Sequence, residues 1–154
     1  MLRKACALSA LLAIAVLAIH SWPKSYALNG PGVIRVTDTE LRRTRVDLGR
    51  HGLTPGDMEI TRSLLYNRRI TTKAIGHGEL VCTFTGGVRR TCTGTFVLPK
   101  GHLVVAGAIL YRQLFQLAVI GGTELYTSAR GTLTVTALPD GRGRNVLLFR
   151  LTAT

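Results

Sequence analysis

The sequence predicts an all-β protein, folded as an eight-stranded antiparallel up-and-down β-barrel. After residue 27, β-like runs of about 8–10 residues follow one another without a convincing helix, and short turns with Gly or Pro separate them. This spacing suits either a sandwich or a barrel. The short sequential connections favour antiparallel neighbours, and closing the sheet removes its exposed edges. We therefore expect the barrel.

The first expected strand is Val33–Glu40, whose side chains point alternately to its two faces. Asp38 and Glu40 share one face of it with two aliphatic residues. A Pro-Gly turn precedes the second strand. The third strand contains Gly76 and Gly78, which predict a bulge or a sharp coil within it.

The later strands are bounded by clear turn signals. Pro99-Lys100-Gly101, Gly121-Gly122 and Pro139-Asp140-Gly141 each end one apolar run before the next begins. In chain order, the expected strands are Val33–Glu40, Asp57–Tyr66, Thr71–Thr85, Thr91–Leu98, His102–Leu110, Arg112–Ile120, Arg130–Leu138 and Arg144–Thr152.

The first 27 residues have the three parts of a secretory signal peptide. Arg3 and Lys4 form a positive n-region, Ala5–Ile19 is an uncharged apolar stretch, and Ser25-Tyr26-Ala27 provides small residues at positions −3 and −1 of a cleavage site. An uncleaved anchor is the alternative, but 15 residues fall short of the ~20 that a spanning helix needs. We expect one barrel domain, residues 28–154, to be secreted to the periplasm or the extracellular space.

The exported chain is expected to be basic. Without Arg3, Lys4 and Lys24, 17 basic residues stand against 8 acidic ones, a net charge of +9. This charge would attract an anionic wall polymer or membrane surface. We expect no nucleic acid partner, because the arginines are scattered without an aromatic stacking strip or a binding motif. Most should be solvated at strand edges and turns; they include Arg42, Arg43, Arg45, Arg50, Arg62, Arg68, Arg69, Arg89 and Arg90.

Two cysteines remain once Cys6 has left with the signal peptide. Because exported proteins meet an oxidising compartment, Cys82 and Cys92 are expected to form a disulfide. Each lies in a β-like run, and Gly86–Arg90 between them is a good hairpin connection, so the two should face each other on neighbouring strands. Closing this loop would stabilise the fold by roughly 3 kcal/mol. A redox or metal pair lacks the C-x-x-C spacing and nearby ligands.

Two segments, His102–Leu110 and Leu114–Ile120, are apolar on both faces. Such strands are buried on both faces, so one face should line the barrel while the other sits in a subunit interface. We expect a homo-oligomer, a trimer or a dimer. An outer-membrane barrel is the weaker alternative, because it needs aromatic girdles and apolar alternation in every strand, whereas this chain has polar stretches such as Asn67–Lys73.

One tract resembles a known family. Leu117–Thr123 ends in Gly-Gly-Thr, Tyr126 follows, and Ala129-Arg130-Gly131 leads into the next strand. This order is similar to the most characteristic tract of the dirigent and allene oxide cyclase-like barrel superfamily, and the cysteine hairpin resembles its exported bacterial-type members. One departure is Glu124, which stands where the family usually has a further glycine. We expect either about 1 kcal/mol of backbone strain there or a differently shaped turn.

The resemblance implies a barrel, commonly trimeric, with a mostly apolar cavity and no cofactor. Dirigent proteins steer the coupling of phenoxy radicals that a separate oxidase makes, and allene oxide cyclases hold an unstable epoxide for ring closure. Both restrict a ligand's conformation in a dry cavity. We therefore expect a secreted barrel that binds a small apolar or aromatic molecule and steers its stereoselective coupling or cyclisation. Turnover stays open; an enzyme of this kind would be a cofactor-free cyclase, an isomerase or lyase.

Three residues are candidate catalytic groups. Asp38 and Glu40, two residues apart on one face, would orient a polar ligand head or act as general acid and base if that face is the inner one. The alternative is a solvent-facing pair bound to Arg42 or Arg130. Arg130, the arginine of the Ala-Arg-Gly tract, is either a structural tie or a donor in the cavity.

Six further residues are candidate ligand-binding groups, and ordinary packing or solvent exposure is the alternative for each. No metal constellation is recognised among the histidines. The candidates are Tyr66, His77, Glu79, Tyr111, Glu124 and Tyr126.

Two other classes of function compete with this one. The protein would be a non-catalytic small-molecule binding or cell-wall-associated protein if its cavity were wholly apolar. It would be a structural oligomer if its own side chains filled the interior. A cavity with unpaired carboxylates or an inward arginine favours the coupling or cyclising barrel.

Overall fold

The computed structural model describes residues 30–49, 51–67, 73–110 and 112–153. The predicted signal peptide and Tyr111 lie outside these residues. The elements in chain order are β1 (Val33–Val46), β2 (Met58–Tyr66), β3 (Gly76–Gly86), β4 (Arg89–Leu98), β5 (Gly101–Ile109), β6 (Leu114–Gly122), the 3-10 turn η1 (Glu124–Tyr126), β7 (Ala129–Ala137) and β8 (Arg144–Ala153).

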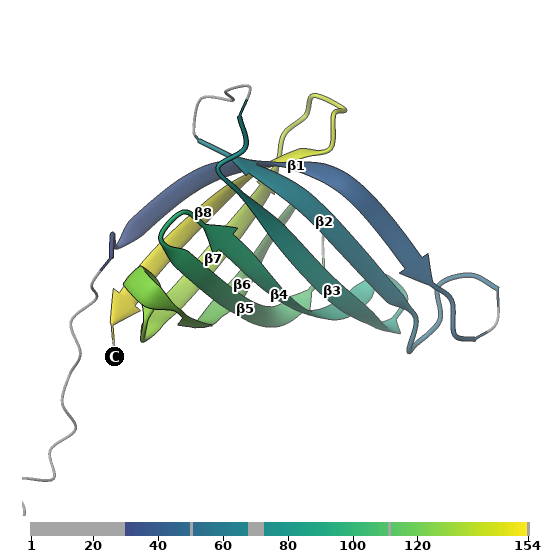
Figure 1. The fold of residues 1–154 in the computed structure, drawn as a ribbon. Helices are drawn as coiled ribbons and strands as arrows, with labels where there is room; N and C mark the ends of the chain where they lie inside the picture. Colours follow the sequence, from purple (N-terminus) through teal and green to yellow (C-terminus); the bar gives the residue numbers. More distant parts are fainter. Residues whose placement is uncertain (1–29, 50, 68–72, 111, 154) are drawn as a thin grey trace, which may run out of the picture.

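The eight strands form a closed antiparallel barrel, as the sequence predicts (Figure 1). Each strand pairs with the next one along the chain, and β8 closes the barrel by pairing with β1. The connections β1–β2, β3–β4, β5–β6 and β7–β8 therefore share one end of the barrel, and the other connections share the opposite end. Within the described ranges, no helix is long and apolar enough to cross a membrane.

The longest strand, β1, continues past the predicted end at Glu40 and contains a β-bulge. Glu40 pairs with Ser63 and Arg42 pairs with Arg62, so Leu41 is an extra residue, and it is 66% exposed. A bulge re-aims the side chains that follow it. Residues 43 and 45, rather than 42 and 44, consequently share the inward face with Asp38 and Glu40.

The predicted bulge at Gly76 and Gly78 is wrong. β3 begins at Gly76, and its pairing with β2 from Gly76 and with β4 from His77 shows no shift near either glycine. Gly78 instead allows the Phe96 side chain to pack closely against the backbone of β3. A Cβ atom there would lie 2.8 Å from two carbons of the Phe96 ring, which covers the glycine from β4. The β3–β4 pairing shifts further on, between Phe84 and Gly86.

The predicted disulfide is confirmed. Cys82 and Cys92 are paired across β3 and β4 with Cα atoms 4.0 Å apart, and their sulfurs are bonded. Both side chains are buried inside the barrel. Since alternate residues of a strand share a face, Arg90 on β4 must also point inward.

An apolar core fills the end of the barrel that holds the β4–β5 and β6–β7 connections. Leu103, Leu133 and Phe149 are fully buried there. The Phe96 and Phe149 rings meet edge to face with centroids 5.4 Å apart, an arrangement that aromatic pairs favour. Tyr126 of η1 belongs to this core, and burial raises the pKa of its hydroxyl. The interior is therefore closed at one end and polar at the other.

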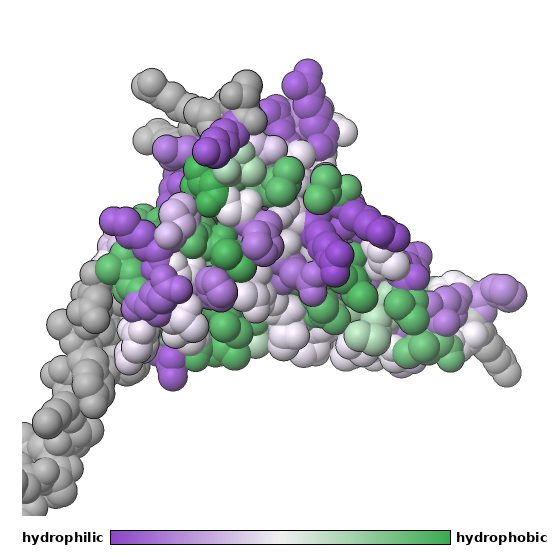
Figure 2. Space-filling view, in the orientation of Figure 1, coloured by the Kyte–Doolittle hydropathy of each residue, from purple (hydrophilic) through white to green (hydrophobic). Residues whose placement is uncertain are grey.

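Apolar side chains also lie on the outside of β6, as the doubly apolar pattern predicts. Leu114 and Ile120 are about half exposed, and Ala118 between them is exposed. Figure 2 shows polar and apolar residues interspersed over the face on which β2–β5 lie. The predicted oligomer stays a prediction.

Candidate functional site

A cavity of about 100 Å³ occupies the polar end of the barrel interior. Its size is comparable to the ~150 Å³ engineered cavity that accepts one benzene ring. The apolar part of its wall comes from six strands and consists of Leu80, Phe96, Ile109, Phe115, Val135 and Leu147. The polar part consists mainly of Asp38, Glu40, Arg43, Glu59, Thr61, Ser63, Arg90, Arg112 and Asn145.

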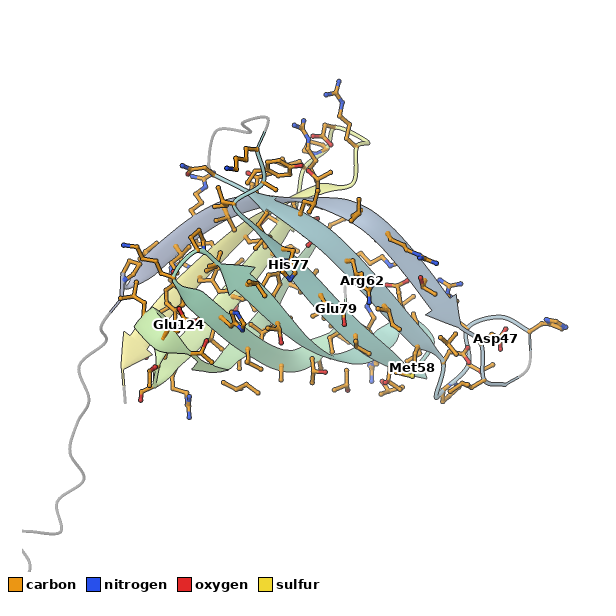
Figure 3. The ribbon with its side chains drawn as sticks, in the orientation of Figure 1. Asp47, Met58, Arg62, His77, Glu79 and Glu124 are labelled. Atoms are coloured by element: carbon orange, nitrogen blue, oxygen red, sulfur yellow. A yellow bond between two sulfur atoms is a disulfide. The ribbon has the colours of Figure 1, made fainter. Side chains whose placement is uncertain are left out.

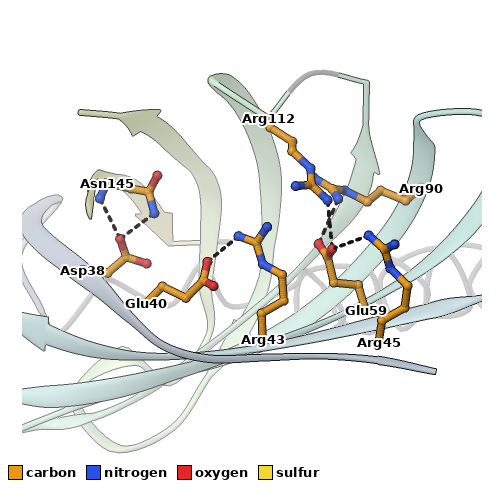
Figure 4. Close-up of polar contacts among 8 residues, drawn as sticks. All are labelled: Asp38, Glu40, Arg43, Arg45, Glu59, Arg90, Arg112 and Asn145. Atoms are coloured by element: carbon orange, nitrogen blue, oxygen red, sulfur yellow. Dashed lines mark hydrogen bonds and ion pairs between the residues drawn. The ribbon is translucent and has the colours of Figure 1, made fainter. Parts of the chain in front are cut away.

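Asp38 lies on the cavity wall and is only 8% exposed. Its Oδ1 accepts two hydrogen bonds from Asn145 on β8, from the backbone N at 3.0 Å and from Nδ2 at 2.8 Å (Figure 4). Burial raises the pKa of the Asp38 carboxyl, although the bonds from Asn145 and Ser63 oppose this shift. Asp38 therefore holds a proton more readily than an ordinary aspartate, as a general acid must.

Glu59 is the centre of a cluster of arginines. Its Oε1 accepts from Arg90 Nη1 at 2.9 Å, its Oε2 accepts from Arg112 Nη2 at 2.9 Å, and Arg45 Nη2 lies 3.7 Å from Oε2. Figure 4 shows these three side chains converging on the one carboxylate from β1, β4 and the β5–β6 connection. Three guanidinium groups against one carboxylate leave a surplus of two positive charges.

Arg90 is the most deeply buried of these arginines, with a side chain 7% exposed. Its guanidinium carbon lies 5.7 Å from the centre of the Phe84 ring, in cation–π contact. Among the residues that the structure describes, its Nε–H has no hydrogen-bond acceptor. Burial lowers the pKa of Arg90, and repulsion from the neighbouring arginines acts in the same direction while Glu59 opposes it.

Two of the three predicted catalytic residues line the cavity together. Asp38 and Glu40 both face it from β1, and Glu40 forms an ion pair with Arg43, not with Arg42 or Arg130. Arg130 is exposed on β7 and donates from Nη1 to the backbone oxygen of Ala129 at 3.0 Å. It does not line the cavity.

The predicted ligand-binding residues are dispersed (Figure 3). His77 is exposed on β3, and Glu79 borders the cavity but is bound to Arg62 at 2.7 Å in an exposed ion pair. Tyr66 is half-buried at the end of β2, with Leu65 before it in the core.

The last two predicted residues belong to the β6–β7 connection, at the end of the barrel away from the cavity. Tyr126 is buried in the apolar core, and Glu124 is exposed with a φ of 53°. Of the two alternatives expected at Glu124, backbone strain or a differently shaped turn, this left-handed φ corresponds to backbone strain. The structure does not bring either residue to Asp38.

Seven polar residues of the cavity wall were not among the candidates predicted from sequence: Arg43, Glu59, Thr61, Ser63, Arg90, Arg112 and Asn145. Arg90 also differs from the expectation of solvated arginines, because the barrel wall buries it. A signal for it exists in the sequence. Arg90 precedes Cys92 by two residues, so an inward disulfide implies an inward arginine. Glu59 likewise shares one face of β2 with Ser63 and Leu65, because an even number of positions separates it from each.

Among the residues that the structure describes, no group of three or more His, Cys, Asp or Glu side chains is placed to hold a metal ion.

The comparisons with known proteins give structural similarity alone, since no family model and no curated protein sequence matches this chain. A structure of pyocyanin demethylase matches with a TM-score of 0.68 and 23% identity, over 78% of this chain and 99% of that one. A pterocarpan synthase dirigent protein matches with a TM-score of 0.60 and 13% identity, over 77% of this chain and 81% of that one.

A Diels–Alderase from Streptomyces koyangensis matches with a TM-score of 0.62 and 15% identity, over 77% of this chain but only 64% of that one. The fold of this chain is therefore that of the dirigent and cyclase-like barrels, as the resemblance in its sequence predicted.

Proposed function

We propose that this protein is an exported barrel that binds a small apolar or aromatic molecule and steers its coupling or cyclisation without a cofactor. The observation that carries the proposal is a cavity with an apolar wall on one side and a buried acid, Asp38, with an inward arginine, Arg90, on the other. A wholly apolar cavity would have favoured simple binding.

The two sides of the cavity have different tasks in this proposal. The aliphatic and aromatic wall holds the body of the ligand in one folded conformation, which lowers the entropic cost of ring closure or of directed coupling. Asp38 protonates or orients a polar group of the ligand, since its raised pKa favours the protonated form.

Neither reaction requires the barrel itself to oxidise or reduce the ligand. In a cyclisation, the ligand rearranges its own bonds, and a proton given by Asp38 returns to it. In a coupling, a separate oxidase removes one electron from each phenol, whose proton goes to the solvent, and two of the resulting phenoxy radicals form the new bond. The named structural neighbours support small-molecule chemistry in this fold, as they include a demethylase of pyocyanin, a pterocarpan synthase and a Diels–Alderase.

The test is a product analysis with the purified protein. Phenols with a one-electron oxidant, and unsaturated epoxides without one, are incubated with and without protein, and enantiomeric excess is measured by chiral chromatography. We expect an excess that Asp38→Asn abolishes and that Arg130→Ala, a charge removed outside the cavity, leaves unchanged. Racemic products throughout, despite saturable binding of the same compounds, would make the protein a carrier instead.

A further inference from the structure

The arginine cluster carries more positive charge than its own carboxylate balances. Glu59 is shared by Arg45, Arg90 and Arg112, and the other nearby pair, Glu40 with Arg43, is already neutral. Like charges held close together without a counter-ion repel one another. Water screens the half-exposed Arg45 and Arg112, but Arg90 is buried.

Arg90 also has a donor without an acceptor. Its Nε–H is buried and makes no hydrogen bond to any part of the chain that the structure describes, while its Nη1 is bound to Glu59. A buried donor left unpaired costs free energy, more so when it is charged. Arg90 lines the cavity together with Arg112, and an anionic acceptor there would balance the surplus charge of the cluster, because guanidinium groups bind carboxylates through paired N–H donors.

The apolar part of the cavity wall indicates what the uncharged body of such a ligand would be. Phe96, Phe115 and Leu147 offer a dry apolar surface in a cavity on the scale of one ring. We infer that the cavity binds a small carboxylic acid with a single-ring or short unsaturated body, its carboxylate held by Arg90 and Arg112 and its body lying against the apolar wall. This inference rests on the proposed function and names the class of its ligand.

The test uses two compounds of nearly the same shape, trans-cinnamate and its neutral amide, cinnamamide. Binding of both to the full chain is measured by isothermal titration calorimetry at neutral pH. We expect cinnamate to bind about tenfold or more tightly than cinnamamide, the difference that one charge-assisted contact makes. Added NaCl should weaken the binding of cinnamate alone, since it screens half-exposed charges.

Three variants separate a ligand contact from a structural one. Arg112→Gln should weaken cinnamate binding about tenfold and leave cinnamamide unchanged. Glu59→Gln should strengthen cinnamate binding, because it removes the competing carboxylate and raises the local surplus of positive charge. Arg62→Gln removes the same charge from an exposed arginine that is paired with Glu79 and does not itself line the cavity. It should change neither affinity by more than about twofold.

The possible results distinguish a failure of the carboxylate inference from a failure of the proposed function. If cinnamamide and neutral phenols bind as tightly as cinnamate, the carboxylate inference is overturned and the proposed function stands. If neither the acid nor any neutral compound binds, both are overturned. Should Glu59→Gln fail to fold, Arg112→Gln decides alone, and equal cinnamate affinity in that variant and the wild type would overturn the inference.

Discussion

Arg90 and Glu59 meet across 2.9 Å in the wall of the barrel, with only 7% and 4% of their side chains exposed. They come from strands that are not neighbours, β4 and β2, so the bond crosses the interior beneath the disulfide-bearing strand β3. Burial of either charge alone would cost much free energy, and each charge offsets that cost for the other. The pair thereby holds a charged guanidinium group inside the barrel, on the wall of the cavity.

The first prediction concerns this pair. Glu59→Ala should lower the free energy of unfolding by about 3–5 kcal/mol, because it leaves the buried guanidinium of Arg90 without its counter-ion. Glu79→Ala is the matched control, since it breaks a carboxylate–arginine pair on the exposed side of the same sheet and should cost about 1 kcal/mol or less. Urea denaturation followed by circular dichroism measures both. Equal losses would mean that Arg90 finds another partner.

The second prediction is a pH dependence that Asp38 imposes. Burial raises the pKa of its carboxyl above the unfolded value of about 3.9. Asp38 therefore favours the folded state most below that pH, and this contribution is lost as pH rises through the folded pKa. Asp38→Asn cannot ionise, so its stability relative to the wild type should improve between pH 3 and pH 7.

Asp140 provides a control of opposite sign for Asp38. The pKa of its carboxyl is lowered, first by the hydrogen bond from the Arg142 backbone N–H and further by Arg144. Its contribution is present above the unfolded pKa and lost as pH falls. Asp140→Asn should therefore lose stability relative to the wild type over the same rise in pH. Urea midpoints at both pH values measure the two trends, and parallel trends would contradict the assignment for Asp38.

Much of the architecture could be predicted from the sequence, because alternation and turn chemistry are local. The order of the eight strands, most of their ends and the disulfide follow from residues close together in the chain. The exceptions are the end of β1, which lies at Val46 and not at Glu40, and the start of β3, which lies at Gly76 and not at Thr71. The bulge at Leu41 could not be predicted, and it decides which residues of β1 after Glu40 enter the cavity. A period-two pattern read through it assigns Arg42 rather than Arg43 to the inner face.

The site was harder to predict than the fold for a related reason. Asp38 and Glu40 were found because they are neighbours on one strand. The cluster around Glu59 joins residues that are 31 and 53 positions apart, and only barrel closure brings them together. The glycines of β3 likewise signalled a special position, but whether this meant a bulge or close packing depended on Phe96 of the next strand.

The third prediction tests the disulfide. Cys82→Ser should lower the free energy of unfolding by roughly 3 kcal/mol, the cost of losing the covalent closure of the loop, while the barrel is retained. Its circular dichroism spectrum at low temperature should match that of the wild type. A reducing agent supplies the control, since it should lower the melting temperature of the wild type and leave that of Cys82→Ser unchanged. A wild-type melting temperature insensitive to reduction under unfolding conditions would contradict a stabilising bridge.

The last prediction concerns the contact between Gly78 and Phe96 on the cavity wall. A methyl group at position 78 would lie 2.8 Å from the Phe96 ring and 3.0 Å from Ser63 Oγ. The ring cannot simply move away, because its other contacts include the edge-to-face pair with Phe149. Gly78→Ala should therefore cost about 1–3 kcal/mol by overpacking.

A second substitution separates overpacking from a loss of backbone freedom at Gly78. Phe96→Leu removes the ring, so Gly78→Ala should cost less in that background than in the wild type. A double-mutant cycle of urea denaturation measures this coupling. If the cost of Gly78→Ala were the same in both backgrounds, the glycine would be needed for its backbone and not for the ring above it. Because Phe96 also lines the cavity, the cycle tests whether the packing of β3 against β4 fixes the position of the apolar wall that the proposed ligand would contact.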